Sequence, residues 1–310
     1  MTVDSAVVEV RDLTKRYDGV LAVDSISFEV RAGECFGFLG PNGAGKTTTV
    51  RMLTGIIQPD GGSASLMGHP AGSVRAKQFC GVLPEMANPY ADLSAWNNLM
   101  LMAELYGVPS STAKERSEEL LRVLGLSERR KSLVKTYSKG MKQRLTLSMA
   151  LVSDPAVLFL DEPTSGLDVQ SARLMRDLLR TLNAERKTIF LTTHNMDEAN
   201  ELCDRVAIIN KGRIIAIDAP EKLRATTSSL YSVEVSFADD VALEPLENLP
   251  GVNSVRKLGD KYRLYTASPG DVVTSLVNYC CSCGVKIVSL NTLTPSLEDT
   301  FVALTDKGVR

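Results

Sequence analysis

A glycine-rich stretch carries the clearest chemical signal in the sequence. The segment Gly40-Pro41-Asn42-Gly43-Ala44-Gly45-Lys46-Thr47-Thr48 fits the pattern G-x-x-x-x-G-K-[ST] in full. Glycines let successive backbone N–H groups turn toward phosphate oxygens, and a helix that starts there adds partial positive charge. Lys46 can reach the outer phosphates of a nucleotide, and the Thr47 hydroxyl can ligate Mg²⁺. The stretch therefore predicts a site for a nucleoside triphosphate.

Two adjacent carboxylates form a second chemical signal. Asp161 and Glu162 follow the apolar run Val157-Leu158-Phe159-Leu160, which reads as a buried strand. With a phosphate loop present, this is the Walker B arrangement, in which Asp161 joins the Mg²⁺ shell and Glu162 orients and deprotonates the attacking water. An acidic strand end in an ordinary loop is the alternative interpretation.

The elements around these residues must bring them together. A strand at 34–39 precedes the phosphate loop, and a helix from Thr47 to Leu53 follows it and ends at Gly55. Further on, strands alternate with helices; we expect strands at 157–160, 188–192 and 206–209 and helices at 171–182 and 196–202. Such alternation predicts a mostly parallel sheet whose ligands gather at the carboxyl ends of the strands. Both chemical signals lie at such ends.

Other segments complete the first domain. Residues 94–151 show apolar stripes at helix spacing, whereas the flanking pattern predicts short strands at 7–13, 25–30, 64–67 and 77–83. The character changes near Ala219-Pro220, and Thr226-Thr227-Ser228-Ser229 reads as a linker. We predict domains at 1–222 and 223–310.

The second domain has its own pattern. Strands are predicted at 231–237, 252–258, 262–266 and 285–290, and helices at 241–246, 271–281 and 296–304. The order strand-helix-strand-strand-helix-strand is that of the split unit in a ferredoxin-like fold. We interpret this part as a small α+β domain. A dimer-stabilising appendage and a ligand sensor are both open as its role.

Composition narrows the class of protein. The chain has 310 residues, a formal charge of -2 and a hydrophobic fraction of 44%. An acidic balance gives no reason to expect a nucleic-acid partner. An apolar run of about 18 residues is missing, and the first residues lack the pattern of a signal peptide, so we expect a soluble cytosolic protein.

The cysteines fit the same compartment. Cys35, Cys80 and Cys203 stand among apolar residues and are predicted to be core thiols. Cys280, Cys281 and Cys283 are close enough to raise the idea of a metal site. Because neither histidine of the chain lies near them, buried helix cysteines are the favoured interpretation.

Three further segments complete a recognisable constellation. They are Tyr137-Ser138-Lys139-Gly140-Met141-Lys142-Gln143-Arg144, Pro163-Thr164-Ser165-Gly166-Leu167-Asp168 and Thr192-Thr193-His194-Asn195-Met196. In order and spacing, these and the two signals above resemble the nucleotide-binding subunit of an ATP-binding-cassette (ABC) transporter over about residues 5–222. The resemblance implies an α/β fold, the P-loop NTPase ABC cassette, with a mixed, largely parallel sheet and a helical subdomain at about 88–152.

The resemblance also implies roles for individual residues around one ATP. Tyr17 would stack on adenine, Val23 would lie beside the base or ribose, and residues 42–48 would wrap the phosphates. Lys46, Glu162 and His194 would be the catalytic residues, with His194 in the switch position.

The resemblance further implies a second cassette. Ser138 and Gly140 match the signature that contacts the γ-phosphate of ATP held by the opposite subunit, and Asp168 matches the D-loop position. One chain carries one cassette, so a homodimer or a pair with another ABC subunit is expected.

Two departures from the family pattern are informative. The signature reads Tyr-Ser-Lys-Gly-Met, and Glu85 stands where most members have a Gln that links Mg²⁺ to the membrane partner. A carboxylate can ligate Mg²⁺ but cannot donate as an amide does. Both changes, and the ending at 294–301, resemble exporters of the daunorubicin drug-resistance type.

These observations predict an ATPase subunit, peripheral on the cytoplasmic face of the membrane, that powers a separately encoded permease. Export of a drug, antibiotic, lipid or similar compound is favoured, and residues 85–98 would receive a membrane coupling helix through Met86, Tyr90 and Trp96 unless these pack in the core. The alternative is a soluble ABC-type ATPase acting on nucleic acid or ribosomes. No sustained heptads lie between Lys46 and Ser138, which disfavours that class.

Overall fold

The computed structural model describes residues 5–225 and 231–307 and contains two compact units. They comprise Met1–Ala219 and Pro220–Arg310, so the second unit begins at Pro220 and not at residue 223 as predicted. The expected linker at 226–229 lies outside the described residues. None of the described helices is long and apolar enough to cross a membrane.

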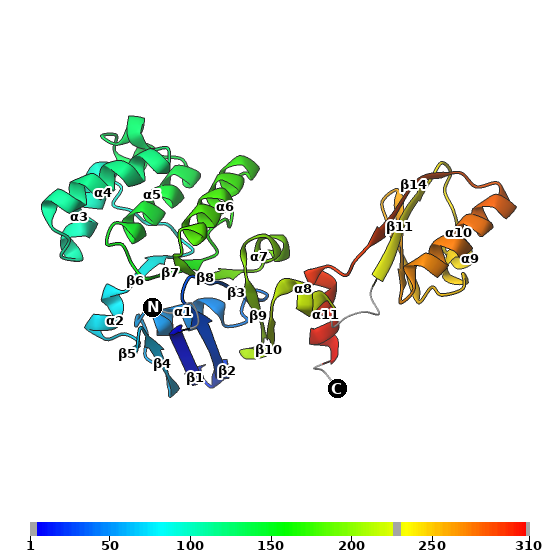
Figure 1. Ribbon diagram of the computed structural model, residues 1–310, viewed down its shortest axis with the longest axis horizontal. Helices are drawn as coiled ribbons and strands as arrows, with labels where there is room; N and C mark the ends of the chain where they lie inside the picture. The colour runs from blue at the N-terminus through cyan, green and yellow to red at the C-terminus, as the bar shows by residue number, and fades with distance from the viewer. Residues whose placement is uncertain (1–4, 226–230, 308–310) are drawn as a thin grey trace. The chain divides into compact units, whose positions relative to one another are not determined.

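A six-stranded sheet forms the centre of the first unit (Figure 1). Its strand order is β10-β9-β3-β8-β7-β6, and only β10 runs antiparallel to its neighbour. The bounds are β3 Cys35–Leu39, β6 Cys80–Leu83, β7 Val157–Asp161, β8 Thr188–Thr193, β9 Arg205–Asn210 and β10 Arg213–Asp218. All residues of β3, β7 and β8 are buried, which explains why they read as unbroken apolar runs. The predicted, largely parallel sheet is confirmed.

An antiparallel sheet of order β2-β1-β4-β5 packs against the central sheet across a shared core. Its strands are β1 Ala6–Tyr17, β2 Val20–Arg31, β4 Gly61–Leu66 and β5 His69–Pro70. Phe28 of β2 stacks on Phe36 of β3 with ring centroids 5.4 Å apart, and Phe190 of β8 closes the same cluster. This core holds the strand before the phosphate loop in a fixed place.

Helices cover the central sheet and form a separate subdomain. The helix α1 Lys46–Leu53 follows the phosphate loop, and α6 Val169–Ala184 and α7 Met196–Leu202 follow β7 and β8. The subdomain comprises α3 Ala95–Leu105, α4 Ser110–Val123, α5 Lys139–Leu151 and the 3₁₀ turns Ser127–Arg129 and Val134–Thr136. Leu99, Leu121 and Leu145 meet in its core. In Figure 1 these helices lie on the opposite side of the cassette from β1, β2 and β4.

The segment predicted as a strand at 77–83 begins differently. Val74–Gln78 is the helix α2, and the Ser73 hydroxyl caps it by accepting a hydrogen bond from Ala76 N. The strand β6 starts only at Cys80. The prediction failed at this boundary because a five-residue helix shows too little periodicity to be recognised.

The second unit contains the predicted order of strands and helices. Its elements are α8 Pro220–Ala225, β11 Tyr231–Phe237, α9 Leu243–Glu247, β12 Ser254–Leu258, β13 Lys261–Thr266, α10 Pro269–Cys283, β14 Ile287–Leu293 and α11 Leu297–Lys307. The four strands pair antiparallel in the order β12-β13-β11-β14. With a helix after the first and third strands, this agrees with the split unit expected from the sequence.

The cysteines divide by burial. Cys35, Cys80, Cys203 and Cys280 are buried, whereas Cys281 and Cys283 are exposed. The prediction of core thiols is confirmed for the first three, but the interpretation of buried helix cysteines is wrong for Cys281 and Cys283. Across the described residues, no cluster of three or more His, Cys, Asp or Glu side chains is placed to hold a metal ion.

Candidate nucleotide site

The phosphate loop connects β3 to α1 and depends on two glycines with no room for a side chain. A methyl group on Gly40 would lie 2.3 Å from the carbonyl oxygen of Ile209, and one on Gly45 would lie 2.5 Å from that of Ala22. Gly45 also has a φ of 108°, in the region that favours glycine, and it directly precedes the first turn of α1. The loop therefore keeps its backbone N–H groups close to the helix N-terminus.

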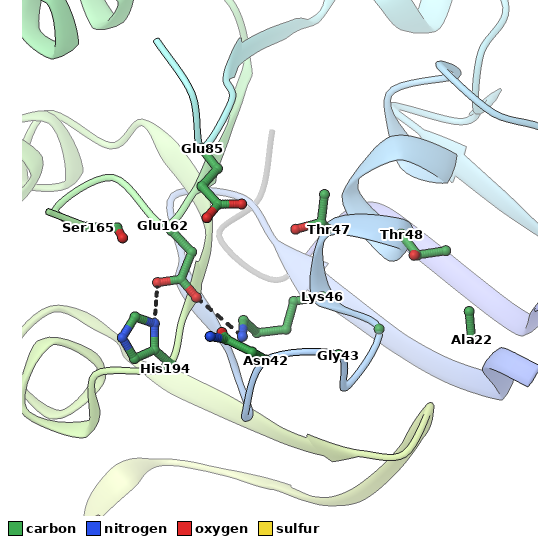
Figure 2. Close-up of a pocket in the computed structure, with 11 residues that line it drawn as sticks. Ala22, Asn42, Gly43, Lys46, Thr47, Thr48, Glu85, Glu162, Ser165 and His194 are labelled. Carbon is green, nitrogen blue, oxygen red and sulfur yellow. Dashed lines mark hydrogen bonds and ion pairs between the residues drawn. The ribbon is translucent and has the colours of Figure 1, made fainter.

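A pocket of about 420 Å³ opens over this loop. It has a size typical of small-molecule sites. Its lining combines the phosphate loop with side chains from distant segments: Ala22, Asn42, Gly43, Gly45, Lys46, Thr47, Thr48, Glu85, Glu162, Ser165 and His194. The structure thus brings together nine of the predicted residues and adds Ala22 and Ser165, which the sequence analysis missed. Figure 2 shows Glu85 reaching toward the space between Glu162 and Thr47.

Lys46, Glu162 and His194 are joined by consecutive polar contacts in this pocket (Figure 2). Lys46 Nζ lies 3.2 Å from Glu162 Oε1, and His194 Nδ1 lies 2.7 Å from Glu162 Oε2. Lys46 Nζ also donates to the carbonyl oxygens of Gly40 (2.7 Å) and Pro41 (3.2 Å). Lys46 and Glu162 are each only 6% exposed. The attraction between their opposite charges therefore offsets part of the free-energy cost of removing each charge from water.

Thr192 organises the two carboxylates at the end of β7. Its hydroxyl donates to Asp161 Oδ1 at 2.5 Å and accepts from Glu162 N at 3.2 Å. Glu162 directly follows β7 and has a φ of 51°, a conformation that is uncommon for a residue other than glycine. Asp161 is buried and is not among the residues that line the pocket.

The site fits a nucleotide with Mg²⁺ by its donor set. The Thr47 hydroxyl and the carboxylates of Glu85 and Asp161 are hard oxygen ligands of the kind that Mg²⁺ takes. The glycine backbone offers N–H donors where side chains would clash, as phosphate binding requires.

Neither of the two residues expected beside the base, Tyr17 and Val23, lines the pocket. Tyr17 is 43% exposed at the end of β1, and the ammonium of Lys15 sits 5.5 Å from its ring centroid. Val23 is fully buried in the core and does not line the pocket, so its place beside the base or ribose stays a prediction. Successive side chains of a strand point to opposite faces, and Ala22 of β2 lines the pocket instead. Strand alternation alone could have indicated this neighbour.

Comparisons with known proteins agree with this geometry. A family model described as ABC transporter matches residues 23–165. Nod factor export ATP-binding protein I of Burkholderia pseudomallei (strain 1710b) is 41% identical over 304 residues, which span 97% of this chain and 98% of that protein. This chain belongs to the ATP-binding proteins of ABC transporters. Linearmycin resistance ATP-binding protein LnrL of Bacillus subtilis (strain 168) is 36% identical over 308 residues, 97% of this chain and 99% of that protein.

Solved structures of ABC proteins share the cassette fold. An ATP-binding subunit of an ABC transporter superposes with a TM-score of 0.66 at 29% identity, covering 71% of this chain and 92% of that one. The cbiO1 protein from Clostridium perfringens, part of the ABC transporter complex cbiONQ, gives a TM-score of 0.64 at 28% identity, with 72% and 92% covered. The predicted cassette and its ATPase class are confirmed, and the relatives named above favour the transporter over the nucleic-acid alternative.

Ser138, Gly140 and Asp168, the residues expected in the signature and the D-loop, lie outside the lining of the chain's own pocket. The Ser138 hydroxyl caps α5 by accepting from Met141 N, and Asp168 caps α6 by accepting from Ser171 N at 2.9 Å and Ser171 Oγ at 2.8 Å. These hydrogen bonds from Ser171 hold the pKa of Asp168 below its ordinary value. A methyl group on Gly140 would lie 2.6 Å from Ser171 Oγ, so the two caps are neighbours.

Proposed function

We propose that this ABC ATPase powers a separately encoded membrane permease that exports a drug, antibiotic, lipid or similar compound. The observation that carries the hydrolytic part is the set of contacts over the phosphate loop that joins the buried Lys46 and Glu162 to the more exposed His194. Two relatives named for export or resistance, matched over nearly their full length, support the transport part.

Lys46, Glu162 and His194 each have a distinct role in hydrolysis. Glu162 accepts the proton of the attacking water, and His194 fixes the carboxylate by its contact with Oε2. Lys46 faces the Gly40 and Pro41 carbonyls as well as Glu162, and it exchanges one of these partners for an outer phosphate. Thr47, Glu85 and Asp161 would hold Mg²⁺, whose charge would neutralise the phosphate oxygens.

A second cassette completes the site in this proposal. Ser138 and Gly140 stand at the start of α5, where a helix N-terminus favours phosphate, and Asp168 stands at the start of α6. Their position away from the chain's own pocket lining supports a role toward nucleotide on a homodimeric or paired ABC subunit.

The permease contact is proposed at the loop before α3. Met86 is 73% exposed and Tyr90 is 53% exposed, so core packing does not account for either. Trp96 is half-buried and packs on the core of the helical subdomain. Asn98 holds the loop by accepting from Tyr90 N and donating to Tyr90 O. A shaped loop with exposed apolar side chains suits a membrane coupling helix, which would place the chain on the cytoplasmic face of the membrane.

Two experiments test the proposal. The Glu162→Gln variant should lose at least about 100-fold in ATP turnover and accumulate as an ATP-bound dimer, measured by phosphate release and size-exclusion chromatography. Hydrolysis at the parent rate would refute the assignment of Glu162. Gentle solubilisation of native membranes should co-purify a stoichiometric polytopic protein, whereas recovery of ribosomes or nucleic acid would refute export.

A further inference from the structure

Glu198 is a buried carboxylate that none of the roles above uses. It lies in the first turn of α7, four residues after His194, and is 1% exposed. Buried carboxylates are rare because the loss of water must be offset by hydrogen bonds or an opposite charge. Thr164 Oγ1 donates to Glu198 Oε1 at 2.9 Å. Oε2 has no well-aligned hydrogen-bond partner in the described parts of the chain.

The Thr164–Glu198 bond runs beside the contact between Glu162 and His194. Thr164 follows Glu162 by two residues in the loop that leads from β7 to α6. Glu198 follows His194 on the segment that leads from β8 into α7. The two segments are therefore joined twice, once at 2.7 Å between His194 and Glu162 and once at 2.9 Å between Thr164 and Glu198. Two separate contacts fix the relative orientation of two segments more closely than one does.

The start of α7 is itself held in place. The Asn195 side chain accepts hydrogen bonds from Asp197 N at 3.0 Å and Glu198 N at 3.1 Å. The Glu198 backbone is therefore anchored by Asn195, the residue directly after His194, while the Glu198 side chain reaches Thr164. The contact to Thr164 and the anchor next to His194 thus belong to one short segment.

The surroundings of Glu198 raise the pKa of its carboxyl group. Burial is the main cause that raises the pKa of Glu198, and the nearby carboxylate of Glu162 raises it further. The hydroxyls of Thr193 and Thr164 and the charge of Arg176 on α6 act in the opposite direction. The remaining titratable neighbour, Cys203 at the end of α7, is buried and has a raised pKa of its own. An unpartnered oxygen costs less free energy on a neutral carboxyl group than on an ionised one.

We propose that Glu198 is a positioning residue that holds the loop 163–168 against the start of α7 through Thr164 and so fixes the approach of His194 to Glu162. It does not line the pocket and touches no reacting group. Because the same loop ends at Asp168, Glu198 also sets the path of the segment proposed to face the second cassette. The inference rests on the proposed roles of Glu162 and His194.

Three variants of the full chain test this role: Glu198→Gln, Glu198→Ala and Thr164→Val. The Gln side chain is neutral, and its carbonyl can accept from Thr164, so kcat should stay within about 3-fold of the parent. The Ala and Val variants lose the bond, and their kcat should fall about 10- to 100-fold with little change in KM for ATP. The double variant Glu198→Ala/Thr164→Val should have a kcat no lower than that of the slower single variant, because both substitutions remove the same contact.

Other outcomes would overturn the inference. Equal losses in Glu198→Gln and Glu198→Ala, additive losses in the double variant, or a change in KM alone would each refute positioning. Should Glu198→Ala fail to fold, Thr164→Val carries the test, since it removes one hydroxyl at nearly constant volume. Glu162→Gln serves as the reference: full turnover there refutes the proposed function, whereas lost turnover there with parent kcat in Thr164→Val refutes only the positioning role.

Discussion

Gly45 and Gly43 occupy the same loop but meet different surroundings. A methyl group on Gly45 would lie 2.5 Å from the Ala22 carbonyl oxygen, whereas one on Gly43 would have nothing within 4 Å. Both have positive φ, 108° and 79°. We expect Gly43→Ala to cost about 1 kcal/mol from backbone strain and Gly45→Ala about 3 kcal/mol or more from strain and clash together. Chemical denaturation of the two variants measures the difference, and equal losses would contradict the close approach to Ala22.

The raised pKa of Glu198 makes a prediction for stability against pH. A carboxylate whose folded pKa lies above its unfolded value of 4.5 penalises the folded state when ionised. That penalty is present above the folded pKa and disappears as pH falls toward the unfolded value. Relative to Glu198→Gln, the parent should therefore gain stability as pH falls from 8 to 5. Urea unfolding of both proteins at the two pH values measures this gain, and a parent that loses stability relative to Glu198→Gln on acidification would exclude a raised pKa.

Residue patterns predicted much of the site because its chemistry depends on residues close in sequence. The phosphate loop and Asp161-Glu162 were identified by their spacing alone, and Lys46, Glu162 and His194 do meet. Ala22 was missed because its methyl side chain gives no sign of ligand binding, and Ser165 was missed because its local sequence does not show that the folded loop brings it to the pocket. Glu198 was missed because its burial depends on the packing of α7, which one sequence does not show.

At the scale of elements, the helix α10 shows how cysteines close in sequence can differ in burial. Cys281 points away from Cys280 around the helix, and Cys283 is the last residue of the helix, so only Cys280 is buried. The exposed pair should react with a thiol reagent in the native protein. Burial raises the pKa of Cys80 to about 11, and Cys203 is also buried with a raised pKa. Both thiols should therefore react only after unfolding. The number of reactive thiols, counted in the native and in the denatured protein, tests this prediction. The control is the double variant Cys281→Ser/Cys283→Ser, in which no thiol should react in the native state.

The accuracy of the predicted elements did not follow their length. The seven-residue elements α7 and β11 have the predicted limits 196–202 and 231–237, and the five-residue strand β7 was predicted to within one residue. The helix α2 was predicted as part of a strand, and β10 was not predicted at all. Five- and six-residue elements on the margin of a sheet owe their conformation to neighbours more than to local propensity.

At the scale of the whole molecule, each unit has its own core. The pocket lining lies entirely within Met1–Ala219, and a separate cluster that includes Val233, Leu264 and Leu276 fills the second unit. A chain ending at Ala219 should therefore fold and bind ATP with an affinity within about 3-fold of the parent. Circular dichroism and nucleotide titration of the truncated chain test this, and loss of the folded signal would show that the first unit depends on the second.

The contact between Lys46 and Glu162 also affects how an inactive variant should be read. In the parent, the carboxylate of Glu162 balances the charge of the buried Lys46, which is also proposed to bind an outer phosphate of ATP. Replacing this carboxylate with an amide leaves Lys46 without its anionic neighbour, and a phosphate then takes over that part as well. A tight ATP complex of Glu162→Gln would thus report two effects, arrested turnover and a vacated counter-charge. An ATP affinity measured on Glu162→Gln would therefore be higher than the ATP affinity of the parent protein.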